Sequence, residues 1–186
     1  MIERLKKPAP ATIDFRELRF SALLDAPLST RGTLRYLAPD HLERLVREPY
    51  LERTTIRGES VRVERDGEKL TTFALKRAPE LKGLLSAFGA LLTGDSGAVQ
   101  SNFEIEASGT ASQWELRLVP RDARIRERVQ EIIVIGRDDA PNCLLMSGAG
   151  EARTISLFNE LGQVVPDKQA TAEQLTARCR SGNSTR

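Results

Sequence analysis

The chain has 186 residues, of which 40% are hydrophobic and 29% are charged. That composition can bury one sizeable core, and no shift along the chain marks a boundary, so we predict a single domain over residues 1–186. The formal net charge is +2, from 28 basic and 26 acidic residues. Because both signs are scattered along the chain, this balance argues against the basic stripe of a nucleic-acid-binding protein, and we expect no nucleic-acid partner.

The sequence contains no apolar run long enough to span a bilayer. Residues 1–7 lead directly into Pro8-Ala9-Pro10, without the apolar segment of a signal peptide. Two interpretations stay open at this point: a cytosolic protein, or a mature chain whose leader has been removed.

Alternation of apolar and polar residues predicts strands in the first part of the chain. Residues 31–37 alternate Leu34 and Tyr36 with polar residues, and we expect them to form one edge of the sheet together with residues 13–24. The latter segment has apolar side chains at every second position, namely Leu18, Phe20, Ala22 and Leu24. Further short strands are predicted at 42–46, 53–56, 61–64 and 69–75, with glycine turns at 57–59 and 66–67.

A second series of strands is predicted after residue 100, at 103–106, 113–119, 131–135, 142–146 and 154–158. The strand from Trp114 to Pro120 is the most informative, because it places Trp114, Leu116 and Leu118 on one face and charged residues on the other. One wet face and one apolar face are typical of an open antiparallel sheet. We therefore predict an α+β fold with about ten to eleven antiparallel strands.

Two helices interrupt or follow these strands. Residues 171–180 begin with a threonine cap and a glutamine three residues later, which is the signature of a capping box. Residues 79–93 carry apolar side chains at helical spacing after a proline. These side chains are Leu81, Leu84, Leu85, Phe88, Leu91 and Leu92. The apolar face either packs on the sheet, as most amphipathic helices do, or covers a cavity.

The sequence offers little for catalysis. His41 is the single histidine, and no residue near it in the sequence suggests a nucleophile. Residues 94–97 match a serine-protease nucleophile loop in four letters only, so we interpret them as a helix end and linker. Acidic residues form no ligand cluster with histidine, and no phosphate-binding glycine loop follows a strand. We predict neither enzymatic activity nor a metal or other cofactor.

The two cysteines, Cys143 and Cys179, are 36 residues apart, a spacing that fits no metal or redox motif. They can form a disulfide that ties the C-terminal helix to a strand in an oxidising compartment. Two separate buried thiols are the equally simple alternative.

A curved sheet with an apolar inner face, covered by an apolar helix, favours a hydrophobic binding pocket. Lipid is the ligand class that such a pocket suits. Each methylene removed from water gains about 0.8 kcal/mol, so a long acyl chain needs a large dry surface to leave a membrane.

Five motifs in fixed order carry a resemblance to a known family. They are Gly32-Thr33-Leu34-Arg35-Tyr36-x-x-Pro39-x-x-Leu42, Glu48-Pro49-Tyr50, Thr55-Ile56-x-Gly58-Glu59-x-Val61, Ala78-Pro79 and Trp114-x-Leu116-x-Leu118-x-Pro120. Over about residues 13–166 the chain resembles the LolA-like family of periplasmic outer-membrane lipoprotein carriers, and most of all its LolA-related branch.

The resemblance implies an unclosed antiparallel β half-barrel with a helical lid, as in LolA and LolB. It also implies a monomer in the periplasm that shields acyl chains in transit toward the outer membrane. The implied partners are a lipid or acylated lipoprotein cargo, an inner-membrane exporter as donor and an outer-membrane acceptor. Members of the LolA-related branch are thought to serve other lipid export routes, including the assembly of aryl-polyene-type lipids.

Three departures from the family pattern bear on the cargo. LolA has an arginine that holds its lid closed where this chain has Ala38, and a tryptophan where this chain has Arg44. Both differences argue against transport of triacylated lipoproteins. The family's N-terminal helix is also shortened, to residues 1–7.

We therefore expect a lipid or lipoprotein carrier. The predicted cavity lining is Leu18, Phe20, Leu34, Tyr36, Leu84, Leu85, Phe88, Leu91, Trp114, Leu116 and Leu118. The register of each strand decides which of these face inward. The main alternative is a non-catalytic interaction module of the cell envelope that binds protein through its sheet edge or lid helix. A hydrolase would need Ser96 as nucleophile, and the sequence offers no base for it.

Overall fold

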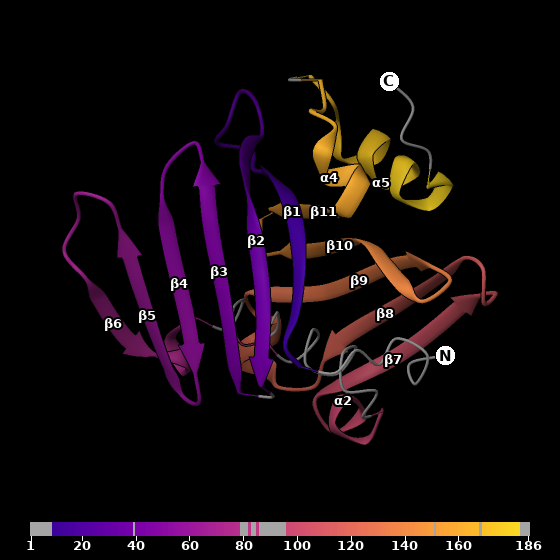
Figure 1. Ribbon diagram of the computed structural model, residues 1–186. Helices are drawn as coiled ribbons and strands as arrows, with labels where there is room; N and C mark the ends of the chain where they lie inside the picture. The colour runs from indigo at the N-terminus through magenta and orange to yellow at the C-terminus, as the bar shows by residue number, and fades with distance from the viewer. Residues whose placement is uncertain are drawn as a thin grey trace.

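The computed structural model describes residues 9–38, 40–78, 82, 85, 96–150, 152–167 and 169–182. Within them the chain forms one antiparallel sheet of eleven strands (Figure 1). The strands are β1 (Ala11–Phe20), β2 (Leu28–Ala38), β3 (His41–Glu48), β4 (Glu52–Arg57), β5 (Ser60–Arg65), β6 (Thr71–Ala74), β7 (Phe103–Gly109), β8 (Trp114–Pro120), β9 (Val129–Arg137), β10 (Ala140–Gly148) and β11 (Arg153–Phe158).

Each predicted strand is present, and the structure corrects two of their ends. The first strand stops at Phe20, so Ala22 and Leu24 lie in the turn that follows it and not in the alternating pattern. The sixth strand stops at Ala74, and a short 3-10 helix, η2 (Leu75–Arg77), follows it. The glycines of the two predicted turns, Gly58 and Gly67, both have positive φ, which explains why glycine stands there.

The expected edge position of the first two strands is wrong. The strand order is β6-β5-β4-β3-β2-β1-β11-β10-β9-β8-β7, so β1 lies in the middle of the sheet. Two consecutive meanders, β1 to β6 and β7 to β11, are joined because β1 pairs with β11, with Phe15 opposite Phe158. The two outermost strands are β6 and β7, and they are not neighbours in the sheet. The prediction of an unclosed antiparallel sheet is confirmed.

Strand register divides the side chains into two faces. Paired residues of neighbouring strands share a face. The face that carries Phe15, Leu34 and Trp114 is the inner face, since one cluster of buried side chains joins β1 to β3 with β7 to β11 across it. The strands of the two meanders run in clearly different directions in Figure 1, which shows how strongly the sheet is bent.

Helices make up a smaller part of the described residues than strands do. Besides η2, the described elements are α2 (Ser96–Asn102), α3 (Ala123–Arg126), α4 (Asn159–Gln163) and α5 (Ala172–Ser181). The predicted C-terminal helix is confirmed, and its capping box is formed: the Thr171 hydroxyl accepts from the Gln174 backbone N–H at 3.2 Å, and the Gln174 side chain accepts from the Thr171 N–H at 2.9 Å. No helix in the described part of the chain is long and apolar enough to cross a membrane.

Two sequence-based interpretations of helical segments have different outcomes. Ser96 and Gly97 were expected in a helix end and linker, but they form the first turn of α2. The helix predicted at 79–93 lies largely outside the described residues; within it, Lys82 and Leu85 are helical. The short N-terminal helix predicted at 1–7 also lies outside them.

Candidate functional site

The inner face of the first meander is an apolar surface built by register. Tyr36 lies opposite Leu42, which lies opposite Ile56, and the row continues through Val61 to Phe73. All of these except Phe73 are at most 3% exposed. Leu75 and Leu85 complete the group, which we call the β2–β6 cluster: Tyr36, Leu42, Ile56, Val61, Leu75 and Leu85, with Val63 and Phe73 partly buried against it.

The inner face of the second meander is also apolar and more extensive. Leu116 lies opposite Val134, and Val134 lies opposite Leu144, so three neighbouring strands present aliphatic side chains to the same side. The whole group, which we call the central cluster, is Phe15, Leu34, Val46, Val99, Phe103, Trp114, Leu116, Leu118, Val129, Ile132, Val134, Leu144 and Phe158. Its residues come from both meanders and from α2.

A band of charges lies on the inner face of β1, β3, β4 and β5 beside these clusters, which adjoin each other on β2 through Leu34 and Tyr36. Arg44 lies on the inner face of β3 between Leu42 of one cluster and Val46 of the other. Its guanidinium contacts Glu17 at 3.0 Å and Glu52 at 3.6 Å. It also lies 4.9 Å from the centre of the Phe15 ring, a distance typical of a cation–π contact.

The band continues toward the loops of the first meander. Glu52 accepts a hydrogen bond from Arg65, whose guanidinium stacks on the Tyr50 ring at 4.5 Å. Hydrogen bonds to Glu52 and then Glu68 raise the pKa of Arg65. At the other end, Ser156 donates to Glu17 at 3.4 Å. The charges are matched in sign, so the band is a compensated polar strip on an otherwise apolar face.

Tyr36 differs from the other polar groups of this face. Its side chain is buried in the β2–β6 cluster, at 3% exposure, and its hydroxyl has no hydrogen-bond partner within the part of the chain that is described. Burial raises the pKa of the Tyr36 hydroxyl, and the negative charge of Asp40 raises it further. The hydroxyl therefore remains a neutral donor at physiological pH.

The outer face differs between the first strands and the centre of the sheet. On β2, β3 and β5 it carries exposed or partly exposed ion pairs, such as Arg35 with Glu43 and Arg62 with Glu64. On β1 and β9 to β11 it carries an outer cluster that packs beneath α4 and α5: Leu18, Ile135, Cys143, Ile155, Leu157, Leu161, Ala172, Leu175 and Cys179. The alternating wet and dry faces predicted from the Trp114 strand thus hold for β2 to β5 and for β8 itself, but not for the central strands β1 and β9 to β11.

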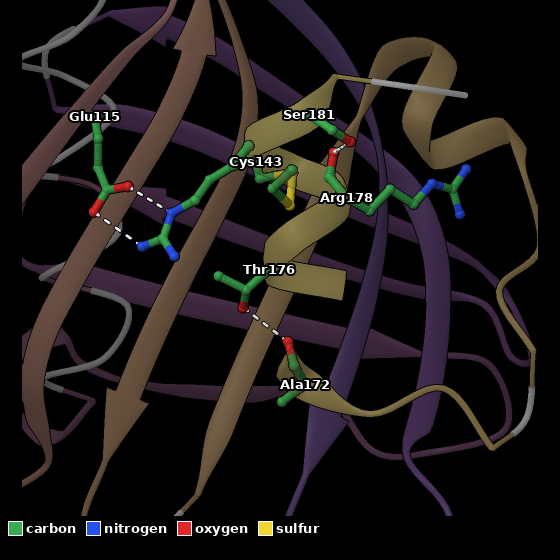
Figure 2. Close-up of a disulfide and its surroundings, with 8 residues drawn as sticks. Glu115, Cys143, Ala172, Thr176, Arg178 and Ser181 are labelled. Carbon is green, nitrogen blue, oxygen red and sulfur yellow. Dashed lines mark hydrogen bonds and ion pairs between the residues drawn. A yellow bond between two sulfur atoms is a disulfide. The ribbon is translucent and has the colours of Figure 1, made fainter. Parts of the chain in front are cut away.

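A disulfide fixes α5 to the outer face (Figure 2). Cys143 of β10 and Cys179 of α5 are bonded, with their Cα atoms 5.9 Å apart. Beside it, Arg180 reaches Glu115 of β8 at 3.0 Å, and Arg137 of β9 donates to the Ser181 carbonyl at 2.8 Å. The sequence left a disulfide and two free thiols equally open, and in the structure the disulfide is formed.

The predicted lining residues fall into three groups. Leu34, Tyr36, Trp114, Leu116 and Leu118 share the inner face, and Leu85 packs against the β2–β6 cluster. A separate pair, Leu18 and Phe20, belongs to the opposite face, where both contact the outer cluster. Leu84, Phe88 and Leu91 lie outside the described residues.

Leu18 and Phe20 were assigned to the cavity because β1 is apolar at every second position. The same strand also buries Phe15 at 2% exposure on its other face, so both faces of β1 are apolar and alternation alone does not identify the inner one. Sequence reasoning also missed inner-face residues of β9 and β10. The run from Ile132 to Ile135 was the available signal, because a continuous apolar run indicates burial on both faces.

The structure also contains an open surface pocket of about 490 Å³ outside the inner face. The turn after β1 forms one wall, from Phe20 to Pro27, and the start of α5 forms another, from Gln169 to Glu173. Arg153 and Glu173 pair across it at 2.9 Å. Its lining is as much polar as apolar, which does not suit an acyl chain.

Groups for catalysis or metal binding do not converge in the described residues. His41 begins β3, and its nearest acidic partner is Glu43, at 3.9 Å from Nε2. Ser96 begins α2. No group of three or more histidine, cysteine or acidic residues there could hold a metal ion.

With this geometry in place, comparison with known proteins identifies the family. Residues 1–174 match the family described as outer membrane lipoprotein carrier protein LolA-like. The chain belongs to this family. The comparison of this LolA-like protein with curated proteins finds no match.

Solved structures with distant similarity include a LolA superfamily protein from Nitrosomonas europaea, at 9% identity and a TM-score of 0.49, covering 85% of this chain and 88% of that one. A second is a lipoprotein-sorting protein domain from Vibrio parahaemolyticus, at 7% identity and a TM-score of 0.46, covering 97% and 94%. A third is LprF from Mycobacterium bovis, at 10% identity and a TM-score of 0.34, covering 87% and 91%.

Proposed function

We propose that this LolA-like protein is a periplasmic carrier, which binds the acyl chains of a lipid or lipoprotein against the inner face of its sheet and passes the cargo toward the outer membrane. The observation that carries the proposal is the inner face itself. Two apolar clusters from strands far apart in the sequence share it, on a sheet that does not close. Such a surface can dehydrate an acyl chain if the two ends of the sheet separate.

The charged band limits the number and length of acyl chains that the inner face can bind. Arg44, with Glu17 and Glu52, places charges on the inner face of β1, β3 and β4 beside the apolar clusters. An acyl chain cannot lie across these charges without losing contact with apolar surface. This favours a cargo with fewer or shorter chains than a triacylated lipoprotein, and it agrees with the substitution of arginine for the family's tryptophan.

The first test is native mass spectrometry of the protein secreted to the periplasm, followed by solvent extraction of any bound molecule. A co-purifying lipid or acylated species is the expected result. A protein that emerges without ligand, and that also ignores added fluorescent fatty-acyl probes, would contradict the proposal.

Location of binding is tested by a matched pair of variants on one strand. Val63 faces inward on β5 against the β2–β6 cluster, and its neighbour Arg62 faces outward. Val63→Trp fills inner space and should weaken binding of a fatty-acyl probe about tenfold, which corresponds to about 1.4 kcal/mol. Arg62→Trp places the same indole ring on the outer face and should leave binding unchanged. Equal effects of both variants would place the ligand elsewhere.

The second candidate function, a protein-interaction module, is favoured by a separate observation. Exposed large apolar side chains gather at one end of the molecule, where the loops 21–27, 49–51 and 66–70 and the α4–α5 link lie (Figure 1). They are Leu23 at 93% exposure, Leu28 at 56%, Tyr50 at 39%, Leu51 at 54%, Leu70 at 46% and Val165 at 71%. The loops at the opposite end of β2 to β5 have none among the residues described.

An interaction module would use this loop end and would need no ligand on the inner face. It predicts a stoichiometric complex with an envelope protein that is lost in the triple variant Leu23→Ser, Leu51→Ser, Leu70→Ser. The carrier function predicts instead that the triple variant still binds acyl probes, because none of the three residues lies in either inner cluster.

A further inference from the structure

Among the described residues, the hydroxyl of Tyr36 is a buried polar group without a partner, set in an apolar surface. Its ring packs among Leu42, Ile56 and Val61 on the inner face, with Leu85 in the same cluster. The residue is 3% exposed, and no described residue accepts or donates a hydrogen bond at its hydroxyl oxygen. Phenylalanine would fill the same space without leaving a polar atom unpaired.

Several other buried polar side chains of the sheet are paired. The Trp114 indole N–H donates to the Asp138 carbonyl at 3.1 Å, Ser156 donates to Glu17, and Arg16 donates to the Gly162 carbonyl at 3.1 Å. Arg178 of α5 is the other described residue with buried, unpaired side-chain atoms, and it lies away from the inner face, on the helix that covers the outer cluster. Among the described residues, Tyr36 is therefore the inner-face residue with a fully buried, unpaired side-chain atom.

An unpaired buried hydroxyl destabilises the empty protein, because it has lost its hydrogen bonds to water. The same hydroxyl strengthens binding of any ligand that brings an acceptor to it. Burial keeps the group protonated, so it acts as a donor. The matching acceptor on an otherwise apolar ligand is a carbonyl oxygen.

We infer that Tyr36 donates a hydrogen bond to the ester or amide carbonyl of a bound acyl chain, so that the β2–β6 cluster selects acylated molecules over alkyl ethers and hydrocarbons of equal length. This inference rests on the proposed carrier function and adds to it the chemical class of the cargo. Hydrocarbon contacts supply affinity without distinguishing these ligands, whereas a buried donor does distinguish them.

The test compares two lipids and three proteins. Palmitoyl lysophosphatidylcholine carries an ester carbonyl, and hexadecyl lysophosphatidylcholine replaces it with an ether. The wild-type protein should bind the ester about five- to tenfold more tightly, as one net hydrogen bond predicts. Tyr36→Phe should lose that preference and keep its affinity for the ether. Tyr50→Phe is the matched control, since Tyr50 is the second of the two tyrosines and is 39% exposed on the loop after β3.

Four other outcomes would overturn the inference. Equal binding of ester and ether by the wild type overturns the inference and leaves the carrier function standing, whereas failure to bind either lipid overturns both. Tyr36→Phe should also be at least as stable to thermal unfolding as the wild type. A clearly less stable Tyr36→Phe would mean that the hydroxyl is paired within the protein. Loss of both lipids at unchanged stability would mean that Tyr36 acts through the shape of the β2–β6 cluster and not through its hydroxyl. Either result would overturn the inference.

Discussion

Two regions of the sheet of this LolA-like protein, β1 with β9 to β11 and β2 to β6, differ in what covers their outer faces. Strands β9 to β11, with β1, are buried on both faces, and a disulfide and α5 cover their outer side. Strands β2 to β6 are apolar on the inner face and carry exposed ion pairs on the outer one. We call β1 and β9 to β11, with α5, the scaffold, and β2 to β6 with their loops the wall, because the outer face of the wall lies open to solvent.

The largest effect should follow from removing the disulfide of the scaffold. Its two cysteines enclose 36 residues, so the variant Cys143→Ala, Cys179→Ala should lose about 3 to 4 kcal/mol of unfolding free energy by loop entropy. Urea unfolding measures this loss. A reductant should lower the stability of the wild type but not that of the variant. If reduction leaves the wild type unchanged, α5 does not contribute to the scaffold as described.

A second large effect should come from Gly136, which lies under the indole ring of Trp114. A β-carbon at this position would lie 2.0 Å from Cζ2 of that ring. Gly136→Ala should therefore cost about 3 kcal/mol by overpacking. Gly67→Ala is the control in the wall: it meets no atom within 4 Å but has a φ of +74°, and should cost about 1 kcal/mol through strain alone. If thermal unfolding showed similar losses of stability for Gly136→Ala and Gly67→Ala, the close packing of Trp114 against Gly136 would be contradicted.

A moderate effect should follow from breaking the capping box of α5. Thr171→Ala removes the acceptor of the Gln174 N–H and should cost about 1 kcal/mol. Hydrogen exchange should rise in the first turn of α5 and not in β5 or β6. Faster exchange throughout the sheet would indicate that the helix and the wall unfold as one unit.

The smallest effect should be found on the wet face of the wall. Arg62 and Glu64 pair at 2.9 Å, with side-chain exposures of 54% and 42%. Arg62→Gln should change the unfolding free energy by less than about 0.5 kcal/mol, because water screens this pair. A loss above about 1 kcal/mol would mean that the outer face of the wall is more tightly held than its exposure indicates.

Much of the fold could be predicted from local signals. Alternation located the strands, glycine marked the turns, and Thr171 with Gln174 marked the last helix. The candidate site was predicted less well. Trp114, Leu116 and Leu118 were assigned to one face correctly, because β8 alternates clearly between apolar and charged residues. Leu18 and Phe20 were assigned to the inner face but lie on the outer one; alternation could not tell the two apart, because β1 is apolar on both faces.

The sequence by itself determined which segments are strands and which residues of a strand share a face, since both follow from a period of two residues. Only the tertiary structure decided that β1 pairs with β11, that Arg44 pairs with Glu17 and Glu52, and that the Tyr36 hydroxyl has no partner among the described residues. Each of these depends on residues distant in sequence becoming neighbours. Local periodicity carries no information about such pairing, because the pairing depends on how the side chains of the whole sheet pack together.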